Sequence, residues 1–141
     1  MGRINAGRVI IGGLVAGVIA NLFDYFINTH LMAEESMANA RLRNLDPAVL
    51  LGSSVMVTWI VVDFLLGLTL VFTYAAMRPR FGAGPRTAVI AAVTIWFAIG
   101  IIVYGFATMG YFTMNVYWKS AIYSLLTMLV AGIAGAAVYK E

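Results

Sequence analysis

The chain lacks cysteine and carries very little charge. None of its 141 residues is cysteine, which excludes disulfides, thiol catalysis, cysteine-ligated zinc and iron–sulfur clusters. The only histidine, His30, is a poor basis for a metal site, which needs several ligands. Charged residues make up 11% of the chain, against about 25% in soluble domains, and hydrophobic residues make up 62%. This composition indicates an integral membrane protein.

The few charges are unevenly distributed, because four long segments nearly lack them. We predict membrane-spanning helices at residues 8–27, 51–77, 87–112 and 116–139. About 20 residues suffice to cross the hydrocarbon layer. Lipid offers no partner to open backbone groups, and these runs do not alternate as the strands of a barrel do. The sequence therefore predicts an all-α fold, a transmembrane four-helix bundle that forms a single domain over residues 1–141.

The long connection between the first two spans, residues 28–50, is expected to contain a short amphipathic helix on the outer surface. Leu31, Ala38, Leu42 and Leu45 recur at helical spacing, while charged side chains face elsewhere. A polar surface loop is the alternative. The connection at residues 78–86 is short and rich in proline, glycine and arginine, which predicts a compact cytoplasmic loop.

The distribution of lysine and arginine predicts the orientation. The side that holds both termini carries six of them: Arg3, Arg8, Arg78, Arg80, Arg86 and Lys140. The other side carries three: Arg41, Arg43 and Lys119. Since short cytoplasmic loops are enriched in Lys and Arg, we expect both termini to face the cytoplasm.

Glycines mark the expected helix-packing positions. Gly13 and Gly17 are four residues apart in the first span, a spacing that lets two helices approach closely. In the fourth span, Gly132 and Gly135 are expected to play the same part. Polar residues follow Gly13 and Gly17 on the same face of the first span. They reinforce a packing seam in one interpretation and face a substrate in the other.

Asp63 lies near the middle of the second span. A charge at that depth costs about 2.5–3.5 kcal/mol on insertion scales, so the side chain should face protein or water. No lysine or arginine lies at the same depth. We expect a buried polar cluster of Asp63, Asn21 and Ser124 or Thr127, with Asp63 either protonated, or bound to hydroxyls, amides or a cation. The cluster is a structural lock, a proton or cation site, or half of a salt bridge to another subunit.

A second aspartate, Asp24, lies on the same stripe as Gly13 and Gly17. It is close to the predicted outer end of the first span. We expect Asp24 to be either hydrated or paired with Lys119, at the start of the fourth span.

The sequence contains no recognisable catalytic chemistry. No nucleophile–base pair, metal-ligand set or cofactor motif is apparent, and Gly82 and Gly84 are not a phosphate loop, since no strand precedes them and no Lys-Ser/Thr follows. No basic face suited to nucleic acid is present either. We therefore predict a protein that is not an enzyme, with no catalytic residue, no cofactor, no metal and no nucleic-acid partner.

Two stretches have a familiar pattern. Residues 7–18 read GRVIIGGLVAGV, and residues 74–89 read YAAMRPRFGAGPRTAV. They resemble a family of small four-pass bacterial membrane proteins of unknown function. The resemblance implies a four-helix fold in the bacterial cytoplasmic membrane, and it implies no activity and no site residues.

Two functional hypotheses follow. The leading one is a non-enzymatic membrane component, an accessory subunit or scaffold of a membrane complex. The alternative is a small proton- or cation-coupled transporter that uses Asp63. Small multidrug exporters are similar in size, but their key acid is a glutamate in the first span, where this chain has none. The expected partners are the lipid bilayer and either other membrane subunits or further copies of the chain.

Overall fold

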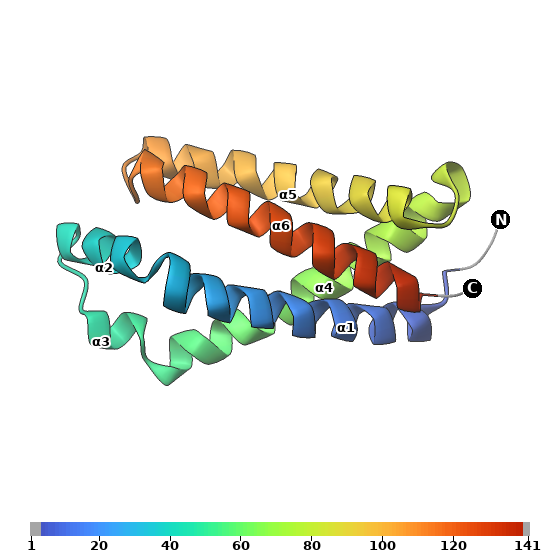
Figure 1. Ribbon diagram of the computed structural model, residues 1–141, viewed down its shortest axis with the longest axis horizontal. Helices are drawn as coiled ribbons and strands as arrows, with labels where there is room; N and C mark the ends of the chain where they lie inside the picture. The colour runs from blue at the N-terminus through green and yellow to red at the C-terminus, as the bar shows by residue number, and fades with distance from the viewer. Residues whose placement is uncertain (1–3, 140–141) are drawn as a thin grey trace.

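The computed structural model describes residues 4–139, which form a bundle of helices (Figure 1). No strand occurs within that range, so the prediction of an all-α fold is confirmed. In chain order the elements are α1 (Ala6–Phe26), its π-helical continuation η1 (Ile27–Leu31), α2 (Ala33–Leu42), α3 (Pro47–Leu50), α4 (Ser53–Phe81), α5 (Pro85–Thr108) and α6 (Met114–Val138).

Four helices are long and apolar enough to cross a membrane: α1 with η1, α4, α5 and α6. They correspond to the four predicted spans, with shifted ends. Helix α4 continues past the predicted end at residue 77 and includes Pro79 in its last turn. It stops at Gly82, whose φ of 83° ends the helix. Helix α5 ends before the predicted residue 112, because Gly110 turns the chain with a φ of 85°.

The helices pack around α4 and α6. Helix α1 packs against both of them, and α5 packs on α6 and more lightly on α4. At one end of the bundle, the backbone N–H of Asn5 donates to the hydroxyl of Tyr139 at 3.2 Å. We call this the Tyr139 end, and the opposite end, which carries α2 and α3, the α2 end (Figure 1).

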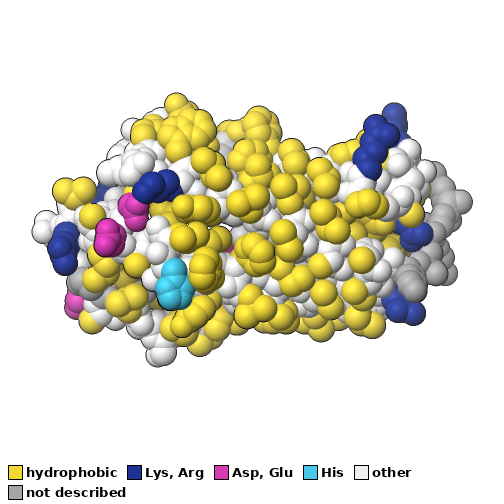
Figure 2. All heavy atoms as spheres, in the orientation of Figure 1, with side chains coloured by type: hydrophobic (Ala, Val, Ile, Leu, Met, Phe, Trp, Pro, Cys, Tyr) yellow, Lys and Arg dark blue, Asp and Glu magenta, His cyan; other side chains and the backbone are white. Residues whose placement is uncertain are grey.

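Charge is segregated along the bundle. Figure 2 shows hydrophobic side chains over the middle of the visible face, basic side chains at the Tyr139 end, and acidic, basic and histidine side chains at the α2 end. The two ends match the two loop sets counted from the sequence. Arg3 and Lys140, which entered that count, lie outside the described residues.

The short helix predicted between the first two spans is present as α2. The predicted apolar residues Leu31, Leu42 and Leu45 are exposed, by 40%, 74% and 47%. Met32 and Ala40 are buried instead, at 3% and 1% exposure. The exposed leucines are available to the membrane interface, while Met32 and Ala40 pack on the bundle.

Small side chains dominate the core, so the helices approach closely. Ala16, Ala91 and Ala92 are fully buried, at 0% exposure. Side chains also link the backbones of neighbouring helices: the indole Nε1 of Trp96 in α5 donates to the carbonyl oxygen of Ala121 in α6 at 2.9 Å. Such contacts suit a bilayer, where the hydrophobic effect does little to hold helices together.

Candidate functional site

The site begins with the packing of α1 on α4. A Cβ added to Gly13 would lie 2.7 Å from the Cα of Leu68, and one added to Gly17 would lie 2.9 Å from the Cα of Phe64. Gly67 of α4 faces the same seam, because a Cβ there would lie 2.5 Å from the carbonyl oxygen of Gly13. The two helices therefore meet backbone to backbone.

This seam places Asp63 inside the bundle. Asp63 precedes Phe64, which packs on Gly17, and shares the buried face of α4 with Gly67 and Leu70. Its side chain is only 4% exposed. An acidic group so far from water needs a polar partner or a proton.

Its neighbour is a second acid, since the carboxyl group of Asp24 in α1 lies close to that of Asp63 and lines the same cavity. Two ionised carboxylates have only acceptor oxygens and repel each other, so a shared proton or a bound cation would relieve the contact. The arrangement is therefore a pair of acids, one from α1 and one from α4.

Helix geometry explains how these two acids meet. Because Gly17 lies opposite Phe64 in antiparallel helices, residue 18 lies opposite Asp63, and Asp24 is six residues, about 9 Å, further along. Side chains in a helix lean toward its N-terminus. In antiparallel helices, Asp24 and Asp63 therefore lean toward each other, which closes the gap.

A small cavity lies beside the pair. It has a volume of about 60 Å³, and its polar lining comes from Asp24, Asp63, Ser124 and Thr127. The hydroxyls of Ser124 and Thr127 donate to carbonyl oxygens within α6, at 3.2 and 3.1 Å, so each oxygen keeps acceptor capacity. No basic side chain is among the cavity-lining residues that the structure describes. The polar part of a mainly apolar lining thus consists of oxygen acceptors.

The volume limits what the cavity holds. Sites for organic ligands usually measure about 300–1,000 Å³, whereas a water molecule needs about 10–15 Å³ by the same kind of measure. At about 60 Å³, the space accepts a few waters or a small cation with water. Within residues 4–139 no group of three or more histidine, aspartate or glutamate side chains is arranged to hold a metal ion.

The predicted polar cluster is only partly assembled. Asp63, Ser124 and Thr127 all line the cavity, with Ser124 exposed at its edge. Asn21 is not among the lining residues that the structure describes. Its amide donates to the carbonyl oxygens of Gly17, at 2.9 Å, and Ile60, at 3.4 Å, so it links α1 to α4. Asp24 occupies the place expected for Asn21.

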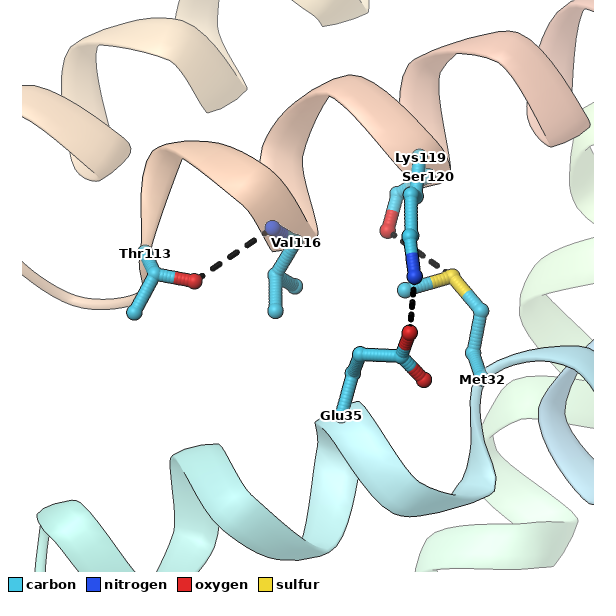
Figure 3. A network of polar contacts seen from close by, with 6 residues as sticks. All are labelled: Met32, Glu35, Thr113, Val116, Lys119 and Ser120. Carbon is cyan, nitrogen blue, oxygen red and sulfur yellow. Dashed lines mark hydrogen bonds and ion pairs between the residues drawn. The ribbon is translucent and has the colours of Figure 1, made fainter.

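Lys119 also differs from expectation. It lies at the α2 end, but it forms an ion pair with Glu35 of α2 instead of Asp24 (Figure 3). The hydrogen bond from Lys119 lowers the pKa of Glu35 below its ordinary value of 4.5. Next to it, the hydroxyl of Ser120 lies 3.5 Å from the Sδ of Met32, so α2 is tied to the start of α6 at two points (Figure 3).

The predicted glycines of α6 occupy different environments. A Cβ on Gly135 would lie 2.8 Å from the carbonyl oxygen of Gly12 and 2.6 Å from Cγ2 of Val71. One on Gly132 would meet only side chains at close range, with Leu70 Cδ2 at 3.3 Å. Gly135 therefore belongs to a backbone contact of α6 with α1, and Gly132 to a looser one.

A larger hollow of about 510 Å³ opens at the α2 end, and its lining includes Asn39, Arg43 and Phe112. The guanidinium of Arg43 lies 6.0 Å from the ring centre of Tyr111. No acid lines this hollow among the described residues, and the arrangement offers no pair of groups for chemistry.

Comparison with known proteins adds no relative. No family model matches the chain, and neither the curated proteins nor the solved structures contain a significant match. The candidate site is therefore argued from its geometry.

Proposed function

We propose that the chain is a multi-pass membrane protein, without enzymatic activity, that couples to protons or small cations through the pair of Asp24 and Asp63. The supporting observation is the pair itself: two neighbouring acids line a small cavity whose other polar lining residues, Ser124 and Thr127, offer hydroxyl oxygens. Acids within membrane spans commonly belong to ion pathways. A pure lock between helices needs no cavity and no second acid.

The proposed chemistry is simple binding. A proton adds to one carboxylate oxygen of the pair, or a small cation takes its place between carboxylate and hydroxyl oxygens. The hydroxyls of Ser124 and Thr127 supply additional oxygen ligands at the cavity wall. Release returns the proton or cation to water and leaves the pair more negative. The small volume favours a proton or inorganic cation over an organic solute.

The test compares proton uptake and flux in three acid-to-amide variants. Purified protein in vesicles receives an imposed pH gradient and membrane potential, and an internal pH dye reports flux. Asp63→Asn and Asp24→Asn should abolish pH-dependent flux and reduce the protons taken up after a pH jump. Asp46→Asn is the matched control, since Asp46 is exposed and its carboxylate accepts from the backbone N–H of Ala48. Equal flux in Asp63→Asn and the native chain would refute coupling.

An accessory subunit or scaffold is the second candidate. Its support is the large apolar surface of α4, where Trp59 and Leu65 are 61% and 57% exposed. Lipid covers such a face as readily as a partner helix does, so this observation carries less weight. Mild extraction from the native membrane separates the two roles: an accessory subunit co-purifies in a larger complex, and a transporter purifies alone or as a homo-oligomer.

The location is also a proposal. A bacterial cytoplasmic membrane with both termini in the cytoplasm agrees with the basic residues Arg8, Arg78, Arg80 and Arg86 near the Tyr139 end. Reporter fusions after residue 141 and after residue 40 test this orientation. Activity of a periplasmic reporter at residue 141 would reverse it.

A further inference from the structure

The hollow at the α2 end is framed by two turns of the same kind. Helix α2 ends with Asn44 in the left-handed region, at a φ of 53°, and α5 ends with Gly110 at a φ of 85°. After each of them, the next backbone N–H donates to the carbonyl oxygen five residues earlier, at 3.0 and 3.1 Å. These are Schellman ends, which favour asparagine or glycine at the left-handed position. Both turns line the hollow of about 510 Å³.

The hollow contains polar side chains whose hydrogen bonds the chain itself does not complete. The Nε of Arg43 and the Oδ1 of Asn39 are buried and have no hydrogen-bond partner within residues 4–139. The guanidinium of Arg43 instead lies 6.0 Å from the ring centre of Tyr111. Asp46, the nearest acid along the chain, is exposed and accepts from a backbone N–H. Because unpaired buried polar groups are unfavourable, Arg43 favours an added acceptor and Asn39 an added donor.

The electrostatic field in the hollow has both signs. Helix α6 begins there with Thr113 as its N-cap, so the positive end of its dipole lies beside the charge of Arg43. Helices α2 and α5 end there, and each helix C-terminus carries about half a negative charge. The full charge of Arg43 exceeds each of these partial charges, so an anion is favoured next to it. A cationic group is favoured near the two helix ends, so the field suits a zwitterion.

The position of the hollow suits a lipid headgroup. It lies between the end of α2 and the turn that joins the membrane-spanning helices α5 and α6 (Figure 1). Large apolar side chains around it are exposed, namely Leu42, Met109 and Tyr111. Aromatic side chains at the ends of spans are typical of the membrane interface. A molecule with its polar head in the hollow can therefore extend apolar chains along the bundle.

We propose that this hollow binds the headgroup of a phospholipid from the leaflet at the α2 end, with its phosphate on Arg43 and a primary ammonium group on Asn39. A guanidinium matches phosphate oxygens, and an ammonium group donates N–H to an amide oxygen. A choline headgroup has no N–H and a glycerol headgroup has no positive charge, so ethanolamine lipids are preferred. The volume lies within the usual range for organic ligands. This site is independent of the pair of Asp24 and Asp63.

The headgroup preference of the native chain is the first test. The full chain in detergent is titrated with dioleoyl phosphatidylethanolamine, phosphatidylcholine or phosphatidylglycerol, and native mass spectrometry gives the Kd of the first bound lipid. The ethanolamine lipid should bind about tenfold more tightly than the choline lipid, the scale of one hydrogen bond to a charged group. Equal affinity for the three lipids, or tighter binding of the choline or glycerol lipid, would overturn the inference.

Three substitutions locate the site. Arg43→Gln should weaken binding of the ethanolamine lipid about tenfold or more, because a charge-assisted contact is lost. Asn39→Ala should remove the preference for ethanolamine over choline and leave the affinity for the choline lipid unchanged. Arg41→Gln is the matched control, since Arg41 is exposed and is not among the described residues that line the hollow. Unchanged affinity in Arg43→Gln, or an equal loss in Arg41→Gln, would rule out the hollow as the site.

A soluble headgroup separates a lipid site from a site for free phosphate compounds. Glycerophosphoethanolamine has the same polar groups without acyl chains, so it should compete only at concentrations roughly a hundredfold higher than the lipid. Competition at equal concentration would overturn a lipid ligand. If Arg43→Gln is not monodisperse in detergent, Asn39→Ala and the headgroup preference of the native chain decide the question.

Discussion

Gly17 of α1 lies against Phe64 of α4 so closely that a Cβ on the glycine would lie 2.4 Å from Cδ1 of the phenylalanine ring and 2.9 Å from its Cα. No rotamer of Phe64 relieves the second contact, because it involves the backbone. The separation of α1 from α4, and hence the meeting of Asp24 with Asp63, depends on the missing side chain at this position.

The first prediction concerns this contact. Gly17→Ala should lower the free energy of unfolding by about 1–3 kcal/mol, because overpacking forces the two helices apart. Thermal unfolding in detergent measures the effect. Gly105→Ala in α5 is the control, since a Cβ there meets nothing within 4 Å. That control should be neutral or gain about 0.5–1 kcal/mol, as alanine is the better helix former. Equal behaviour of both variants would mean that the seam is looser than described.

A second prediction ranks the two glycines of α6. Gly135→Ala should be clearly less stable than Gly132→Ala, because its Cβ would meet the backbone oxygen of Gly12 at 2.8 Å. At Gly132 the nearest atom is the flexible end of Leu70, at 3.3 Å, which has room to adjust. The midpoints of thermal unfolding of the two variants give the order. A reversed order would place α6 differently against α1.

A third prediction concerns the link between α5 and α6. Trp96→Phe removes the donor to the carbonyl oxygen of Ala121 and should cost about 0.6 kcal/mol, the average for hydrogen bonds between membrane helices, and at most about 1.7 kcal/mol. Chemical or thermal unfolding in detergent provides the measurement. Trp118→Phe is the matched control, since Trp118 is 57% exposed, and it should cost much less. Similar losses would indicate that the indole contributes by size rather than by its hydrogen bond.

A fourth prediction concerns pH and the docking of α2. The hydrogen bond from Lys119 lowers the pKa of Glu35 below 4.5, so the ionised form is favoured in the folded state. A group with a lowered folded pKa stabilises the fold above its unfolded pKa and loses that effect as the pH falls through the folded pKa. The contact should therefore be present at neutral pH and weaken progressively below about pH 4.5, the ordinary value.

Hydrogen exchange in residues 33–42, corrected for the intrinsic effect of pH, tests this. In the native chain, hydrogen exchange should accelerate as the pH falls below about 4.5. Glu35→Gln should show the fast exchange already at neutral pH, whereas Glu34→Gln, at the exposed neighbouring position, should behave like the native chain. Fast exchange in Glu34→Gln together with slow exchange in Glu35→Gln would show that Glu34, and not Glu35, holds α2 in place.

The positions of the spans could be predicted from hydrophobic length, because crossing lipid requires only a long apolar run and no particular tertiary contact. A run with few charges crosses lipid wherever it occurs, and the four runs all became helices. The ends of the helices depend on single proline and glycine residues, whose effect on the backbone a hydropathy pattern does not capture. Pro79 was assigned to the loop but lies in the last turn of α4, and Gly110 was assigned to a span, although its positive φ follows the end of α5.

The site was harder to predict, because it depends on how far each side chain leans along its helix. Counting residues from the span ends placed Asp24 near the surface and Asn21 near the depth of Asp63. Because both aspartate side chains lean toward the N-termini of their helices, Asp24 rather than Asn21 reaches Asp63. One sequence signal was available: Ala16, Ala20 and Asp24 are spaced by four residues and form a small-residue stripe that leads to an acid, and all three line the cavity.

The pairing of Asp24 with Asp63 also bears on how the chain enters the membrane. Insertion of an isolated aspartate at mid-depth is unfavourable by about 2.5–3.5 kcal/mol. Helix α1 is synthesised before α4, so Asp24 is already in place when Asp63 arrives, 39 residues later in the chain. The glycine seam then brings the two acids together before α6 is made. The first two long helices thus form a hairpin that holds both acids, and α6 completes the wall of the cavity beside them.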